Sequence, residues 1–173
     1  AEVKLPPLHR VRIRHPEAPA LQNLEKRVAD ALESCQHLPQ IPRGSEVAIA
    51  VGSRGIAKID LITRTVVSGL KGWNLKPFIV PAMGSHGGGT AEGQQEVLKK
   101  LGIDEGSMGC EIRSSMTTVD YGLVTEGTHC HFDANAAGAA GIVHLNRVKA
   151  HTSFPREIES GLIKLIAVGL GKA

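Results

Sequence analysis

The chain has 173 residues, 42% of them hydrophobic and 21% charged, which fits one ordinary globular domain with an apolar core of its own. Its net charge is only +3 and its basic residues are scattered, except at Arg10, Arg12 and Arg14, so we do not expect nucleic-acid binding. No apolar run approaches the roughly 20 residues of a membrane span, and residues 1–8 are too polar for a signal peptide. The three cysteines have no zinc-binding spacing, and we expect a cytoplasmic protein without membrane contact.

The predicted elements begin with a strand and a helix. Residues 3–14 alternate loosely between apolar and polar, which favours a strand. Pro16 opens a helical stretch with apolar residues three or four positions apart, and Pro39 follows its end. The apolar positions of this stretch are Leu21, Leu24, Val28 and Leu32.

Two strand-loop-helix units come next. In chain order we expect a strand at 47–51, a loop at 52–55, a helix at 59–70, a strand at 78–82, a loop at 84–89 and a helix at 90–101. Thr90 is a suitable N-cap for the second helix, and Gly102 is a suitable stop.

The second half predicts shorter elements. We expect strands at 110–113 and 119–132 with a turn at Glu126-Gly127, a short helix at 133–139, a strand at 141–145 and a helix at 156–168. Strands that alternate with helices predict an α/β domain with a mostly parallel sheet and helices packed on it. Ligands bind such sheets at the carboxyl ends of the strands, where the loops here carry Arg54, His86, Lys149 and His151.

The loop Gly84-Ser85-His86-Gly87-Gly88-Gly89 presents backbone N–H groups at the start of a helix, a setting that favours a phosphate or carboxylate. The loop has neither the P-loop nor the dinucleotide-binding spacing. His86 would lie against the bound anion. The alternative is a turn with an exposed histidine.

Two other loop residues have polar chemistry of the same kind. The planar guanidinium of Arg54 suits a carboxylate, although a surface arginine paired with Asp60 is equally compatible with the sequence. His151 titrates near neutrality and could act as acid or base, or be an exposed loop histidine. His86 and His151 on one sheet edge could serve the two faces of one ligand.

Lys164 lies on the last predicted helix, between Ile163 and Leu165. Ile158, Leu162, Leu165 and Ile166 would form its apolar stripe, and Glu157, Ser160 and Lys164 a more polar face. An apolar setting could make this amine nucleophilic. From the helix alone we favour a lysine whose stem packs while its amine reaches water.

Histidines 129 and 131 flank Cys130, and strand alternation puts both rings on one face. We interpret this as a hairpin with outward polar residues, with metal binding as the alternative. Cys35 and Cys110 have no basic neighbours in sequence and fit buried hydrophobic positions.

Taken in order, Gly52-Ser53-Arg54, Gly84-Ser85-His86-Gly87, Lys149-Ala150-His151 and Gly161-Leu162-Ile163-Lys164 resemble the nickel-dependent lactate racemase family, from about Val47 onward. Members of that family have two α/β domains around a nickel pincer nucleotide. The resemblance implies that residues 1–173 are the N-terminal catalytic domain of such an isomerase, with a small 2-hydroxy acid as substrate. It also implies that a second domain follows and that the remaining nickel-ligand histidine falls just past Ala173, so that residues 1–173 hold no metal ligand and are inactive alone.

The same resemblance implies a role for each motif residue. Arg54 would hold the substrate carboxylate, and His86 and His151 would be the two acid/base histidines. Lys164 would tether the cofactor through a thioamide. Gly84, Ser85, Gly87, Gly88 and Lys149 would contact the cofactor. Hydride would leave the α-carbon and return to the opposite face, so the full protein would racemise or epimerise its substrate.

Two departures bear on the substrate. Family racemases carry acidic residues before the arginine and a proline after it, whereas this sequence has Ala50-Val51-Gly52 and Gly55. These differences indicate a different substrate or a different way of binding it.

Two other functions remain open from the sequence. One is a non-enzymatic domain that binds a phosphate or carboxylate, and the other is a hydrolase or lyase, for which no serine or cysteine has an evident base nearby. The apolar segment Leu162–Leu170 close to the end also predicts a partner domain, and an apolar face left bare would promote homo-oligomers.

Overall fold

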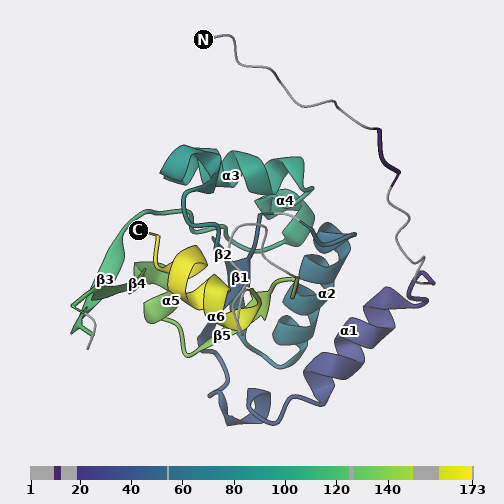
Figure 1. Ribbon diagram of the computed structural model, residues 1–173. Coiled ribbons are helices and arrows are strands. Elements are labelled where there is room, and N and C mark those ends of the chain that lie inside the picture. Colours follow the sequence, from purple (N-terminus) through teal and green to yellow (C-terminus); the bar gives the residue numbers. More distant parts are fainter. Residues whose placement is uncertain (1–9, 13–18, 54, 125–126, 150–159, 173) are drawn as a thin grey trace.

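The computed structural model describes residues 10–12, 19–53, 55–124, 127–149 and 160–172. Within this part of the chain, three parallel strands form the central sheet in the order β2-β1-β5 (Figure 1). The strands are β1 (Glu46–Val51), β2 (Lys76–Pro81) and β5 (Gly141–Leu145). A parallel bridge from Ile79 to Ile112 adds a short segment beyond β2. The predicted α/β domain with a parallel sheet is confirmed.

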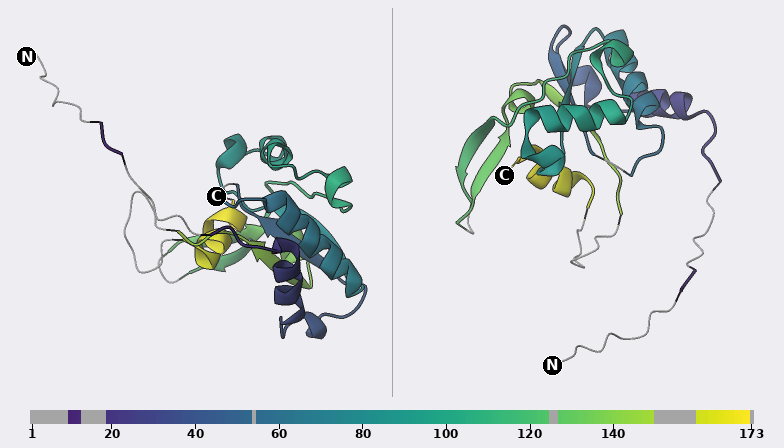
Figure 2. Two further views of the ribbon diagram at one scale, coloured as in Figure 1. Left: turned by 90° about the vertical axis from the view of Figure 1, so that its right-hand side faces the viewer. Right: turned by 90° about the horizontal axis from the view of Figure 1, so that it is seen from above.

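Strand β1 is central and completely buried from Val47 to Val51. Side chains alternate along a strand, so Val47, Ile49 and Val51 pack into one core and the small Ala48 and Ala50 into another. The first core lies under α1 (Leu24–Glu33), α2 (Ile59–Gly72), α3 (Ala91–Lys100) and α4 (Glu105–Met108). The second lies under α5 (Ala134–Ala137) and the C-terminal helix described next, on the other side of the sheet (Figures 1 and 2).

The C-terminal helix consists of α6 (Leu162–Lys164) and a π-helical continuation, Leu165–Leu170. The sequence predicts a helix at 156–168. The observed helix starts later, at Leu162, and ends later, at Leu170, so both predicted ends are wrong. Gly161 has φ of +80°, which prevents a helix from running through it, and residues 150–159 lie outside the described residues. Leu165 and Leu170 are buried against Ala48 and Ala50, whose small side chains let the helix approach the sheet.

A two-stranded antiparallel hairpin adjoins this helix. Strands β3 (Thr118–Leu123) and β4 (His129–Asp133) form it, as the sequence predicts. Asp133 caps α5 by accepting from the N–H of Ala136 at 2.8 Å. Lys172, just past the C-terminal helix, forms an ion pair with Asp133 at 2.8 Å, and both side chains are completely enclosed. The pair fixes the end of the C-terminal helix to the hairpin.

The first helix begins later than the sequence predicts. Helix α1 starts at Leu24 rather than Pro16, and Asn23 before it has a left-handed backbone with φ of 55°. Residues 19–22 are not helical, and 13–18 lie outside the described residues. Val28 and Leu32 pack against the core as predicted, whereas Leu21 is 58% exposed because the helix does not reach it.

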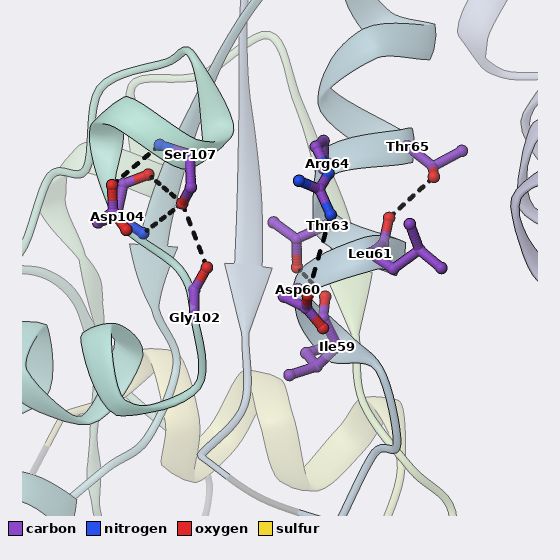
Figure 3. Close-up of polar contacts among 9 residues, drawn as sticks. All are labelled: Ile59, Asp60, Leu61, Thr63, Arg64, Thr65, Gly102, Asp104 and Ser107. Atoms are coloured by element: carbon purple, nitrogen blue, oxygen red, sulfur yellow. Dashed lines mark hydrogen bonds and ion pairs between the residues drawn. The ribbon is translucent and has the colours of Figure 1, made fainter.

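Helix α2 and the start of α4 are stabilised by side chain to backbone hydrogen bonds (Figure 3). The Thr63 and Thr65 hydroxyls donate to the carbonyls four residues earlier, at 2.7 and 2.8 Å, which lets the buried Thr63 satisfy its hydroxyl inside its own helix. Asp104 and Ser107 form a reciprocal capping box at α4.

Candidate active site

The three parallel strands end side by side, which brings their following loops together. Val51 lies opposite both Pro81 and Leu145 in register. Beyond these residues, Gly52 donates its N–H to the Leu145 carbonyl at 3.3 Å, and Ala82 donates to the Val51 carbonyl at 2.8 Å. The described parts of the loops that the sequence singles out therefore start from one sheet edge, where ligands bind in this class of fold.

Ser53 and His86 connect two of these loops. The Ser53 hydroxyl lies 2.5 Å from Nδ1 of His86, a hydrogen bond between residues that follow β1 and β2. His86 itself is exposed, and its backbone N–H donates to the Met83 carbonyl at 3.2 Å. From the sequence, no serine was expected to have a base nearby. Ser53 has one in His86, so this expectation is wrong. The sequence motif Gly52-Ser53-Arg54 contained this serine, but nothing in sequence spacing reveals its contact with His86.

The glycine loop is shaped by its contact with α3. A Cβ on Gly93 would lie 1.8 Å from the Gly87 carbonyl oxygen, so only glycine allows the loop to approach the first turn of α3 so closely. Gly87 and Gly88 have positive φ, and the exposed Gly88 has open space around it. Thr90 caps α3 as predicted, accepting from Gly93 at 3.1 Å. The fully buried Gln94 holds the start of the loop by donating to the Gly84 carbonyl at 2.7 Å.

The loop after β5 contributes two cations. Arg147 donates to the Gly55 carbonyl at 3.0 Å, and Nζ of Lys149 would lie 3.8 Å from a Cβ on Gly55. Both side chains are exposed. The Lys149 N–H also donates to the Ser160 hydroxyl at 2.8 Å, which ties this loop to the start of the C-terminal helix. Two cations beside the loop after β1 favour an anionic ligand there.

The C-terminal helix crosses the ends of β1 and β2. Gly84 donates to the Gly169 carbonyl at 3.3 Å, and a Cβ on Gly169 would lie 2.8 Å from the Ala82 carbonyl oxygen. Leu165 lies 3.8 Å from the position of a Cβ on Gly52. Lys164, the preceding residue, is half-buried. The helix that carries Lys164 thus packs directly on the loops that carry Ser53 and His86.

The predicted faces of this helix are only partly right. Leu165 is buried as expected, but Leu162 and Ile166 are 53% and 37% exposed. Buried positions are instead Leu165, Gly169 and Leu170, because the π-helical turn changes the spacing of inward positions. Of the predicted polar face, Lys164 is half-buried, Ser160 precedes the helix, and Glu157 lies outside the described residues.

His144 and Asn146 belong to the same region and were not singled out by sequence. His144 pairs with Ala50 in register, and its neighbour Ile142, two residues before it, packs in the core under the C-terminal helix. Burial lowers the pKa of His144, which favours a neutral imidazole. Its Nδ1 and the amide nitrogen of Asn146 are buried without a hydrogen-bond partner among the described residues. A histidine inside the apolar strand 141–145 was the available signal.

Two further sequence candidates, Arg54 and His151, lie outside the described residues, as does Ala150 between Lys149 and His151. Their assignments stay predictions. The carboxylate of Asp60, the partner considered for Arg54, lies 3.9 Å from the guanidinium of Arg64, with which it forms an ion pair.

The expected position of the remaining nickel ligand is also untested. The family resemblance implies that this histidine falls just past Ala173, and the described residues end before that point, at Lys172. No group of three potential ligands for a metal ion occurs among the described residues. A nickel ligand beyond Ala173 therefore stays a prediction.

The histidines of the hairpin have an ordinary polar environment. His129 lies 2.7 Å from the Asp120 carboxylate, and the rings of His129 and His131 stack with centroids 6.1 Å apart. The pKa of Asp120 is lowered mainly by the hydrogen bond from the Gly122 N–H and, to a smaller extent, by the hydrogen bond from His129. Cys35 and Cys110 pack against the core as predicted, but they are only half-buried rather than buried.

The fold and these contacts define an α/β domain with a polar site at the carboxyl edge of its sheet. No helix in the described part of the chain is long and apolar enough to cross a membrane. Searches of protein-family models, curated proteins and solved structures find no match to the chain.

Proposed function

We propose that this chain carries active-site residues of an isomerase that racemises or epimerises a 2-hydroxy acid, using a nickel pincer nucleotide. One observation supports it most. The helix that bears Lys164 packs on Gly52 and Gly84, and these two glycines belong to the loops that carry Ser53 and His86. These segments contain three of the four motifs that resemble the nickel-dependent lactate racemases. The motifs are far apart in sequence and have a common location in the fold.

The residues present fit the cofactor in two respects. Lys164 offers a half-buried amine as the covalent tether, and the glycine loop has open space at Gly88 and Gly89, where side chains would otherwise stand. When bound, such a cofactor supplies reversible acceptance of a hydride.

The chain's own residues have simpler tasks in this proposal. Arg147 and Lys149 attract the anionic substrate, and Arg54 binds its carboxylate. His86 takes the hydroxyl proton from one enantiomer or returns it, and His151 does the same on the other face. The buried Leu165 and the backbone of Gly169 exclude water from the edge below them.

The test is the intact mass of the complete protein, produced together with the enzymes that make the cofactor, with nickel analysis in parallel. We expect a covalent adduct that maps to Lys164 and bound nickel. Lys164→Arg should lose both, whereas the matched change Lys100→Arg on the exposed end of α3 should keep both. An unmodified wild-type mass without nickel would refute the proposal.

A non-enzymatic anion-binding domain is the second candidate, favoured by Arg147 and Lys149 around Gly55. Binding needs no nucleophilic amine, so Lys164 separates the two functions. Binding of inorganic phosphate that is lost in Lys149→Ala and unchanged in Lys164→Ala, in a protein without adduct, would favour this candidate.

A further inference from the structure

The hydrogen bond between Ser53 and His86 is held from both sides by the sheet. Ser53 follows Gly52, whose N–H is bonded to the Leu145 carbonyl, and Val51 is completely buried. His86 follows Gly84, which is anchored by both Gln94 and Gly169. The pair therefore joins two anchored strand ends and is part of the framework of the site.

We propose that Ser53 is the positioning residue of His86: its hydroxyl oxygen accepts a hydrogen bond from Nδ1–H, which leaves Nε2 to exchange a proton with the ligand. A neutral imidazole carries one proton, and the hydrogen bond at one nitrogen decides which nitrogen carries it. With Nδ1–H donating to Ser53, Nε2 can accept a proton as a base. After it does so, the same Nδ1–H bond is kept in the imidazolium.

The choice of serine over a carboxylate suits a reaction that runs in both directions, and this part of the inference rests on the proposed function. A carboxylate at Nδ1 would stabilise the imidazolium and hold the proton on the ring. A hydroxyl is neutral and orients the ring without that bias. A histidine that must take a proton in one direction and return it in the other is better served by the neutral partner.

The experiment measures the tautomer of His86 first, because it needs no cofactor. The protein is labelled with ¹⁵N in its histidines, and the ring ¹⁵N shifts are recorded well above the ordinary histidine pKa of about 6.5. His86→Gln assigns the signals. We expect the Nδ1–H form to predominate in the wild type and in Ser53→Thr, which keeps a hydroxyl. Ser53→Ala should shift the population toward Nε2–H, and Ser68→Ala, on the exposed side of α2, should not.

The second readout is turnover of 2-hydroxy acids by the complete, cofactor-loaded protein. Ser53→Ala should lower kcat on the order of tenfold to a hundredfold with little change in KM, and Ser53→Thr should restore it. An unchanged tautomer in Ser53→Ala, or a changed tautomer with full kcat, overturns the positioning role. A changed tautomer in a protein whose wild type lacks all turnover supports the pair and refutes the proposed function instead.

Discussion

Gly93 lies on the first turn of α3, directly against the backbone of Gly87. A side chain at position 93 cannot be accommodated by a rotamer change, because the obstacle is a carbonyl oxygen that would lie 1.8 Å from the new Cβ. The loop would have to move away from α3 and take His86 with it. This one position therefore determines the shape of the whole glycine loop.

We expect Gly93→Ala to lower the free energy of unfolding by roughly 2 kcal/mol or more, although alanine is the better helix former. Urea unfolding followed by circular dichroism measures the effect. Gly72→Ala, at the end of α2, is the matched control, because a Cβ there has nothing within 4 Å. It should be neutral or stabilising by up to about 1 kcal/mol. Equal effects of the two changes would contradict the close-contact explanation.

The two histidines give the second prediction at this scale. Under the proposed function, His86→Gln and His151→Gln should each abolish racemisation by the complete, cofactor-loaded protein, because each enantiomer would need one ring as base and the other as acid. Chiral chromatography of the product measures this. His37→Gln, on the exposed turn before Leu38, should keep wild-type rates. Retained racemisation in either site variant would refute the two-base scheme.

Which residues could be predicted from sequence depended on whether they act through a local pattern. Thr90 and Gly102 were recognised because capping and termination are local. The partnership of Ser53 with His86 was not, because it depends on β1 and β2 being neighbours in the sheet. Burial of His144 was missed for a similar reason, since it follows from the position of β5 beside β1.

Among the elements, those with strong apolar periodicity were predicted well and those set by single backbone conformations were not. Strands β1, β2 and β5 and helices α2 and α3 match the pattern within a few residues. Helix α1 and the C-terminal helix differ from it because Asn23 and Gly161 have positive φ. Apolar spacing does not report such conformations, although Gly161 was a visible candidate for one.

The connection between the C-terminal helix and the hairpin is a buried ion pair, and it yields a stability prediction. Lys172→Ala would leave Asp133 charged and enclosed, so the free energy of unfolding should fall by about 3–5 kcal/mol. Chemical denaturation measures the loss. The exposed pair Lys26–Asp30, with side chains 74% and 51% exposed, is the control, and Lys26→Ala should cost less than about 1 kcal/mol.

The double variant Lys172→Met with Asp133→Asn tests the cause, because an asparagine side-chain oxygen can still accept from the Ala136 N–H and keep the cap of α5. Without either charge no ion remains uncompensated, so the double variant should be more stable than Lys172→Ala. A double variant that is as unstable as the single one would show that the loss comes from packing or from the Ser115 carbonyl that Lys172 also contacts, rather than from the charge of Asp133.

At the scale of the whole molecule, Arg113 joins the segment beyond β2 to the start of β1. Its guanidinium donates to both oxygens of Glu46, at 3.0 and 2.6 Å, and lies 4.0 Å from the centre of the Phe78 ring. The hydrogen bond from Arg113 lowers the pKa of Glu46 below its ordinary value of 4.5. The sheet edge is thus held by a contact whose strength depends on pH.

A lowered folded pKa contributes stability above the unfolded pKa, and this contribution is lost as the pH falls through the folded value. Wild type should therefore be more stable than Glu46→Gln at pH 7, and the difference should disappear near about pH 2. Urea unfolding of both proteins across this range measures it. Glu96→Gln, exposed on α3, should show a smaller difference at pH 7. A difference for Glu46→Gln that is independent of pH would contradict the ionic explanation.

The strand order β2-β1-β5 also has a consequence for the newly made chain. Val47 pairs with Pro77 on one side and with Gly141 on the other, so the second pairing closes a much longer loop and costs more entropy. As the chain leaves the ribosome, β1, α2, β2 and α3 can assemble first, with Ser53 and His86 already in contact. Lys149 and Lys164 arrive with the late half. Until then the Ala48, Ala50 and Phe78 face of the sheet is bare, and a nascent chain stalled at this stage is the form we expect chaperones to bind.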